Sequence, residues 1–191
     1  MHIDEELIKA DYWRAVMYSS LKEQLAGLGL SGSGVEFGGS NGIIQSYCPG
    51  VSWETRGYPP FNVLDSSSWD KEWDVVVLDQ ILEHVERPWE VFDHIGRTCK
   101  TAIITVPFLI GVHPCPTDYW RMTPQAIEML ASPHFSKIDT RSWGNTEVNF
   151  LHSEYDITGV MMANTEERVW REGLESNDEY KPFVIWTVLS K

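Results

Sequence analysis

The chain contains few of the residues that define several protein classes. Its three cysteines, Cys48, Cys99 and Cys115, are odd in number and widely spaced, so they form neither a disulfide framework nor a zinc-binding pattern. Basic residues are also scarce: 15 Lys and Arg stand against 28 Asp and Glu, which gives a formal net charge of −13. Because such a surface repels phosphate backbones, we expect no nucleic-acid partner.

Long apolar runs are missing as well. The longest, residues 102–112, is interrupted by Thr105 and Pro107 and is much shorter than the roughly 20 residues that a membrane span needs. The first six residues lack the basic and apolar regions of a signal peptide. We therefore expect a cytoplasmic protein that does not associate with membranes.

The hydrophobic pattern that is present indicates one α/β domain spanning residues 1–191. Strand-like runs occur at 34–37, 51–55, 75–78, 101–106, 135–142 and 183–189. Helix-like segments occur at 4–28, 41–47 and 90–99 and again from Thr123, a capping residue followed by Pro124. This alternation predicts a doubly wound, mostly parallel sheet of six or seven strands with an antiparallel last strand. An extra N-terminal helix (1–30) and a polar insert, partly helical, at 144–181 complete the expected domain.

The first predicted strand ends in an acid and turns through glycine. Glu36 is followed by Gly38, Gly39, Ser40 and Gly42. A carboxylate and a tight backbone turn at the carboxyl end of a strand suit a nucleoside-containing cofactor. The dinucleotide pattern Gly-x-Gly-x-x-Gly fails here, because Ser40 and residue 43 are not glycine.

Two later segments add to this signal. The first, residues 73–85, is a continuous apolar strand that ends in Asp79 and Gln80, at the edge where open α/β sheets bind ligands. The second runs from residue 105 through His113 to residue 124 and is stiffened by prolines. Together with the glycine turn, these segments resemble class I S-adenosylmethionine-dependent methyltransferases, particularly small ones of the ubiquinone/menaquinone methyltransferase-like group. The resemblance covers about 34–130.

The resemblance implies a Rossmann-like sheet with S-adenosylmethionine as cofactor. The backbone of the turn, from Gly38 and Gly39 through Ser40 to Gly42, would pass under the methionine and ribose parts, with Glu36 near the amino group. Ser40 replaces a glycine of the family pattern. We expect Gly38→Val to abolish cofactor binding while leaving the fold largely intact.

The other cofactor contacts follow from later strand ends. Glu54 would accept the ribose hydroxyls, although a solvated surface glutamate is an equally good interpretation. Either Asn62 or Asp65 would read the adenine. Backbone of Asp79 and the side chain of Gln80 would hold the methionine end. Since only about twenty residues separate the glycine turn from residue 64, the second crossover helix is predicted to be shortened or absent.

The acceptor side requires positioning and, where the acceptor carries a proton, a base. His113 is our first hypothesis for that base, since the pKa of histidine lies near neutrality. Asp118 is the second, with the alternative that it pairs with Arg121. The whole loop also suits a rigid turn with no catalytic role.

The substrate pocket is predicted to contain His84, Tyr119, Trp120 and Arg121. Tyr12, Trp13 and Arg14 suit a lid, although a core position for Trp13 is the better interpretation. We expect no metal, because the candidates share no ligand spacing such as His-x-x-x-His. Those candidates are His84, His113, Asp118 and His152.

The sequence thus favours S-adenosylmethionine-dependent methyl transfer to a small-molecule acceptor, with oxygen preferred slightly over nitrogen. A sugar, a glycan intermediate or a secondary metabolite would fit. The alternative is a catalytically inactive, methyltransferase-like binding or partner subunit. A nicotinamide oxidoreductase comes third, and the oligomeric state is left open.

Overall fold

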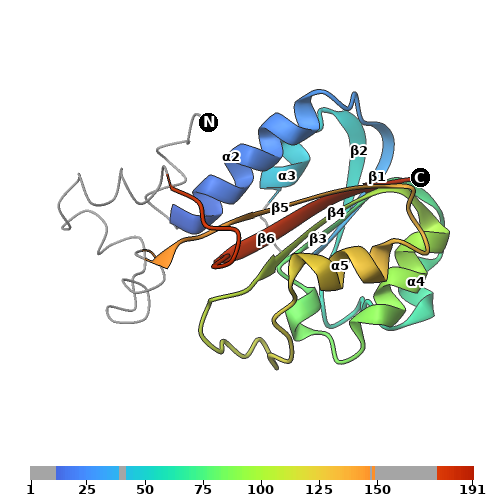
Figure 1. Ribbon diagram of the computed structural model, residues 1–191. Coiled ribbons are helices and arrows are strands. Elements are labelled where there is room, and N and C mark those ends of the chain that lie inside the picture. Colours follow the sequence, from blue (N-terminus) through green and yellow to red (C-terminus); the bar gives the residue numbers. More distant parts are fainter. Residues whose placement is uncertain (1–11, 39–41, 147, 149–175) are drawn as a thin grey trace.

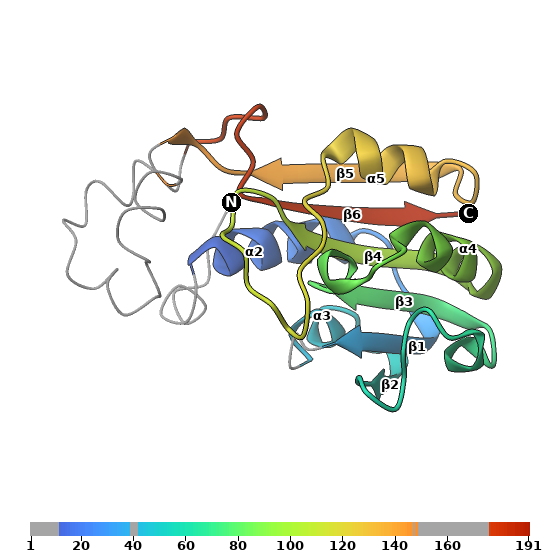
Figure 2. The same ribbon diagram turned by 90° about the horizontal axis from the view of Figure 1, so that it is seen from below.

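A six-stranded mixed sheet forms the centre of the protein. The computed structural model describes residues 12–38, 42–146, 148 and 176–191 (Figure 1). The strands are β1 (Ser31–Gly38), β2 (Gly50–Arg56), β3 (Trp73–Asp79), β4 (Cys99–Pro107), β5 (Lys137–Trp143) and β6 (Val184–Ser190). Their order is β2-β1-β3-β4-β6-β5, and β6 is antiparallel to both of its neighbours (Figure 2). The predicted mostly parallel sheet with an antiparallel last strand is confirmed.

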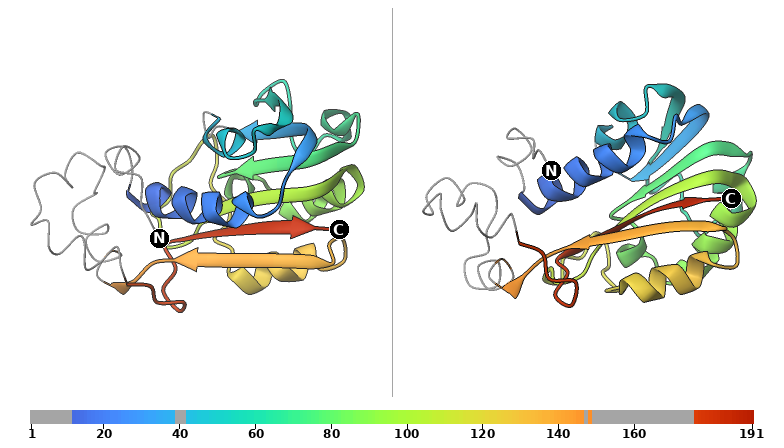
Figure 3. Two further views of the ribbon diagram at one scale, coloured as in Figure 1. Left: turned by 90° about the horizontal axis from the view of Figure 1, so that it is seen from above. Right: turned by 45° about the horizontal axis from the view of Figure 1, so that its top comes forward.

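Helices cover both faces of this sheet. On one face lie α2 (Tyr12–Ala26) and α3 (Ile43–Ser46), and on the other lie α4 (Pro88–Thr98) and α5 (Pro124–Ala131) (Figures 1 and 3). Within β3, Val75 and Val77 join the core under α2, whereas Val76 and Leu78 join the core under α4 and α5. Burial on both faces explains why this strand is apolar throughout.

The local signal at Thr123 placed the start of α5 correctly. The Thr123 hydroxyl accepts the backbone N–H of Ala126 at 3.1 Å, and Pro124 occupies the first turn of α5. This is the capping arrangement expected from the sequence. The N-terminal helix is confirmed over Tyr12–Ala26; the part predicted for residues 4–11 lies outside the described residues.

The connection between β2 and β3 is unusually simple. Residues 57–72 contain a single 3-10 turn, η1 (Ser66–Trp69), and no α-helix or further strand. The prediction of a shortened second crossover is confirmed, and β2 lies at an edge of the sheet. Most of the polar insert, 147 and 149–175, lies outside the described residues. None of the helices in the described part of the chain has the length and hydrophobicity needed to cross a membrane.

Candidate functional site at the carboxyl edge of the sheet

The strand order locates the candidate site. From β1 the chain passes to β2 on one side, and then returns beyond β1 to β3 and β4 on the other side. The connections therefore diverge between β1 and β3, and the carboxyl edge at such a point is where open α/β sheets bind ligands. The residues after β1, β3 and β4 meet at this edge.

Glu36 and Gly38 form the end of β1. The Glu36 side chain is 1% exposed and accepts a hydrogen bond of 2.6 Å from Nε2 of Gln45 on α3. Gly38 has φ +92°, and a Cβ at this position would lie 2.4 Å from Cδ1 of Ile81. The turn therefore requires glycine, which leaves only backbone at the end of β1. Gly42 also has positive φ, +79°.

The close contact with Ile81 corrects one expectation. Valine at position 38 would meet both a left-handed backbone and the Ile81 side chain, so the Gly38→Val variant would disturb the fold as well as any ligand. Gly39 and Ser40 lie outside the described residues. Their assignment to the cofactor stays a prediction.

The end of β3 is held by a network of hydroxyl groups. The Asp79 side chain is buried and accepts hydrogen bonds from the hydroxyls of Tyr18 at 2.7 Å and Thr105. Burial nevertheless raises the pKa of Asp79. Gln80 has the rare φ of +53°, and both its backbone N–H and its Nε2 donate to Thr105 Oγ1. Strained backbone of this kind is concentrated at ligand sites.

The structure does not bring Glu54 to Glu36. Side chains alternate along a strand, and Thr55, next to Glu54, shares the Gln45 amide with Glu36 on the α3 side of the sheet. Glu54 points to the other side. There it contacts three donors: Trp73 Nε1 at 2.6 Å, Lys71 Nζ at 3.2 Å and Arg56 Nη2 at 3.3 Å. The carboxylate is occupied by the protein itself, and the ribose role remains only a prediction.

Asn62 and Asp65 also serve local structure. Asn62 Oδ1 accepts the backbone N–H of Leu64 at 3.0 Å. Asp65 caps η1 by accepting the N–H of Ser67 at 2.9 Å, which lowers the pKa of Asp65. Both are turn contacts typical of Asn and Asp. They do not distinguish between the two residues as adenine partners.

Asp118 and Arg121 lock the loop after β4. The Asp118 carboxylate is covered and accepts from Arg121 at 2.6 and 2.7 Å and from the His113 N–H at 2.8 Å. The Arg121 bonds hold the pKa of Asp118 at about 2. Arg121 also donates to the carbonyls of Ile110 and Gly111. The structure therefore contains the Asp118–Arg121 pair that the sequence offered as the alternative to a catalytic base.

Tyr119 and Trp120 connect this loop to the segment after β3. Their backbone N–H groups both donate to the Glu83 carbonyl, at 2.7 and 3.2 Å, and Trp120 Nε1 donates to the Val85 carbonyl at 2.9 Å. Both rings remain partly exposed, and the Trp120 ring lies edge-on to Trp89. Trp13, in contrast, packs in the core against Phe183.

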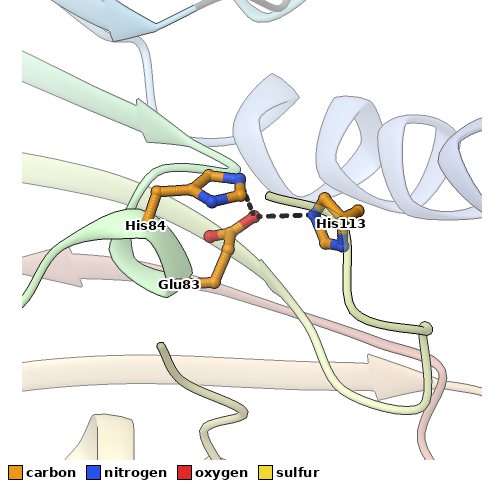
Figure 4. A group of neighbouring side chains, drawn as sticks. All are labelled: Glu83, His84 and His113. Carbon is orange, nitrogen blue, oxygen red and sulfur yellow. Dashed lines mark ion pairs between the residues drawn. The ribbon is translucent and has the colours of Figure 1, made fainter. Parts of the chain in front are cut away.

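Glu83, His84 and His113 form a compact cluster, although they come from two different loops (Figure 4). Glu83 lies in η2 (Leu82–His84), is 1% exposed, and has Oε1 at 3.7 Å from His84 Nε2 and 4.0 Å from His113 Nε2. Neither carboxylate oxygen has a hydrogen-bond partner in the described part of the chain. Burial, with a further contribution from the charge of Asp79, raises the pKa of Glu83 to about 8.

Sequence reasoning missed three of the residues that build this edge. Tyr18 lies within the predicted N-terminal helix, and nothing in the sequence showed that its hydroxyl reaches Asp79. Thr105 and Gln45 likewise act through contacts between segments. A polar residue inside an apolar strand, as Thr105 is in β4, was the one available signal.

Solved structures share this fold, although the sequence matches no protein-family model and no curated protein. An S-adenosylmethionine-dependent methyltransferase from Archaeoglobus fulgidus superposes with a TM-score of 0.58 at 12% identity, covering 98% of this chain and 100% of that one. A putative sarcosine dimethylglycine methyltransferase from Galdieria sulphuraria gives 0.59 at 16% identity, covering 100% and 91%. Phosphoethanolamine N-methyltransferase 2 from Haemonchus contortus, solved with S-adenosylmethionine, gives 0.52 at 12%, covering 95% and 53%.

The chain therefore has the Rossmann-like fold found in S-adenosylmethionine-dependent methyltransferases. These comparisons do not address the narrower ubiquinone/menaquinone-like group, which stays a prediction.

Proposed function

We propose that the protein is an S-adenosylmethionine-dependent methyltransferase that acts on a small molecule. The observation that carries this proposal is the end of β1, where the buried Glu36 is followed by Gly38 at φ +92°. This pair lies at the point where the strand connections diverge, and the fold is shared with methyltransferases. No observation favours the alternative of an inactive partner subunit.

The charge of the site suits the donor. S-adenosylmethionine carries a positive sulfonium and a positive amino group, and the carboxyl group of Asp79 interacts electrostatically with those of Glu36 and Glu83 at this edge. Glu36 would receive the amino group through a charge-assisted hydrogen bond. The backbone from Gly38 to Gly42 and that of Asp79 and Gln80 would lie along the methionine part.

The chemistry then needs mainly positioning. An acceptor lone pair forms a bond to the methyl carbon while the carbon–sulfur bond breaks, and the electron pair stays on sulfur. Of the two candidate bases, Asp118 is occupied by Arg121 and has a pKa of about 2, which makes it a poor base at neutral pH. We therefore retain His113, and we expect His113→Ala to slow turnover by roughly 10²–10⁴ with little change in cofactor affinity.

The acceptor would enter beside the loop between β4 and α5. Tyr119 and Trp120 offer partly exposed aromatic surface there, and His84 and Arg121 are fixed to the backbone of the same loop. A small organic acceptor with oxygen as the preferred nucleophile is our proposal, and a cytoplasmic location remains a prediction.

Calorimetric titration tests the cofactor assignment. We expect S-adenosylmethionine and S-adenosylhomocysteine to bind and NAD to give no heat. Glu36→Gln keeps an acceptor for Gln45 but removes the charge. We expect this variant to bind S-adenosylmethionine about 10–100-fold more weakly, since hydrogen bonds to charged groups contribute about 1.5–3 kcal/mol. Glu128→Gln, on the exposed side of α5, is the matched control. Equal affinity in the two variants, or binding of NAD alone, would refute the assignment.

A further inference from the structure

The Glu83 carboxylate is a buried group that the fold leaves unsatisfied. It is 1% exposed, and neither oxygen accepts a hydrogen bond from the described residues. A buried carboxyl group without partners is costly, and a catalytic role or an ion that completes it is among the recognised reasons for retaining one. Two imidazole nitrogens lie on either side of it (Figure 4).

The distances fit three ligands around one vacant centre. One carboxylate oxygen of Glu83 and one ring nitrogen each of His84 and His113 all lie within 4.8 Å of one another. The oxygen-to-nitrogen distances are 3.7 and 4.0 Å. Ligands bound to one cation at about 2.0–2.2 Å are separated by roughly 3.0–3.6 Å, so each ring needs to approach the Glu83 oxygen by only a few tenths of an ångström.

The outer contacts orient both imidazoles for this task. His84 Nδ1 lies 2.7 Å from the Thr117 carbonyl, and His113 Nδ1 lies 2.9 Å from the Gly111 carbonyl. Because a carbonyl can only accept, each Nδ1 is the donor of these bonds, and Nε2 is the ring nitrogen that each neutral imidazole would offer to an ion. Arg121 Nη2 also approaches His113 Nδ1 at 3.4 Å, but its two hydrogens are directed to closer acceptors.

We propose that Glu83, His84 and His113 bind a divalent first-row transition-metal ion such as Mn²⁺ or Zn²⁺. Two imidazoles favour these ions over Mg²⁺ and Ca²⁺. Three protein ligands leave coordination positions open, as catalytic rather than structural sites do. The sequence-based expectation of no metal depended on linear spacing, which could not register a ligand thirty residues away in another loop.

The role of the ion depends on the proposed methyl transfer. An open position would take a hydroxyl oxygen of the acceptor and lower its pKa. The hydroxyl proton passes to solvent water, the oxygen attacks the methyl carbon of the sulfonium, and the carbon–sulfur pair remains on sulfur. His113 would then act as a ligand instead of a free base.

Metal titration of the tag-free, chelator-treated chain tests the site. Calorimetry with Mn²⁺, Zn²⁺ and Mg²⁺, together with the electron paramagnetic resonance signal of Mn²⁺, should show one ion per chain and Mg²⁺ as the weakest. Glu83→Gln and His113→Ala should each lower the affinity for Mn²⁺ by at least about 100-fold. His134→Ala is the matched control, because that histidine pairs with Asp93 away from the cluster. Equal Mn²⁺ affinity in all three variants overturns the proposal.

The same samples, titrated with S-adenosylmethionine, separate the two proposals. If the chain binds S-adenosylmethionine but none of the ions, the metal site is overturned and the methyltransferase assignment stands. Binding of an ion without S-adenosylmethionine does the reverse. If His113→Ala fails to fold, Glu83→Gln decides alone, since it preserves side-chain size and replaces the carboxyl group with an amide, which is a poor metal ligand.

Discussion

Two carboxyl groups only four residues apart, Asp79 and Glu83, are treated in opposite ways by this protein. Both are almost fully buried, and burial raises the pKa of both. Asp79 accepts hydrogen bonds from Tyr18 and Thr105, which come from α2 and β4. Glu83 accepts none from the described residues and faces two imidazoles instead.

Asp79 therefore has a structural role, whereas Glu83 has carboxyl oxygens that no donor of the described residues satisfies. The Asp79 bonds hold α2 and β4 at the end of β3, so this acid stabilises the edge on which the site is built. Glu83 contributes no such bond and costs stability through desolvation. Buried acids at one sheet edge are therefore told apart by their donors, since burial and pKa direction are the same for both.

The largest expected effect comes from removing Asp79. Asp79→Ala leaves the buried hydroxyl of Tyr18 without its acceptor and should lower the free energy of unfolding by about 2–4 kcal/mol. Thermal unfolding would then show a melting temperature roughly 5–15 °C lower. Tyr18→Phe, which removes one donor only, should cost less. A variant as stable as the parent would show that the Tyr18 contact contributes nothing.

A smaller effect of opposite sign is expected at Glu83. In chelator-treated protein near neutral pH, Glu83→Gln should raise the free energy of unfolding by about 1 kcal/mol, because burial of Glu83 disfavours its charged form, whereas an amide carries no charge to desolvate. Urea unfolding of this variant beside Asp79→Asn measures the contrast directly. Destabilisation of both variants by the same amount would remove the distinction between the two acids.

The smallest effect is expected at Asp74, an acid that has donors but is not deeply buried. It accepts from the Ser33 N–H at 2.8 Å and the Lys100 ammonium at 2.6 Å, and the Lys100 bond holds the pKa of Asp74 at about 2. Because this pKa is below the ordinary value of 3.8, the stabilisation is complete above pH 4 and is lost as pH falls towards 2. Between pH 6 and pH 2, the free energy of unfolding should therefore fall less in Asp74→Asn than in the parent protein, as measured by urea unfolding at each pH. The neighbouring Glu72→Gln should keep the parent profile.

The fold was largely predictable because its signals are local. The apolar run in β3 indicated a strand buried on both faces, and Thr123 with Pro124 marked the start of α5. The shortened connection between β2 and β3 followed from chain length alone. The site was less predictable: Glu36, Gly38 and Asp79 lie at the expected edge, whereas Glu54 points to the opposite face, because one residue of strand register decides which side a side chain occupies.

By itself, the sequence determined the order of strands and helices, the position of the glycine turn and the placement of candidate acids at strand ends. These depend on periodicities of 2 and 3.6 residues and on capping chemistry, which act over a few positions. Only the tertiary structure decided which of the buried acids have hydrogen-bond donors. Tyr18 reaches Asp79 across 61 positions, and His113 reaches Glu83 from another loop. Parallel strands bring their carboxyl ends to one edge whatever the distance along the chain, so the partners of each buried carboxylate are set by the sheet.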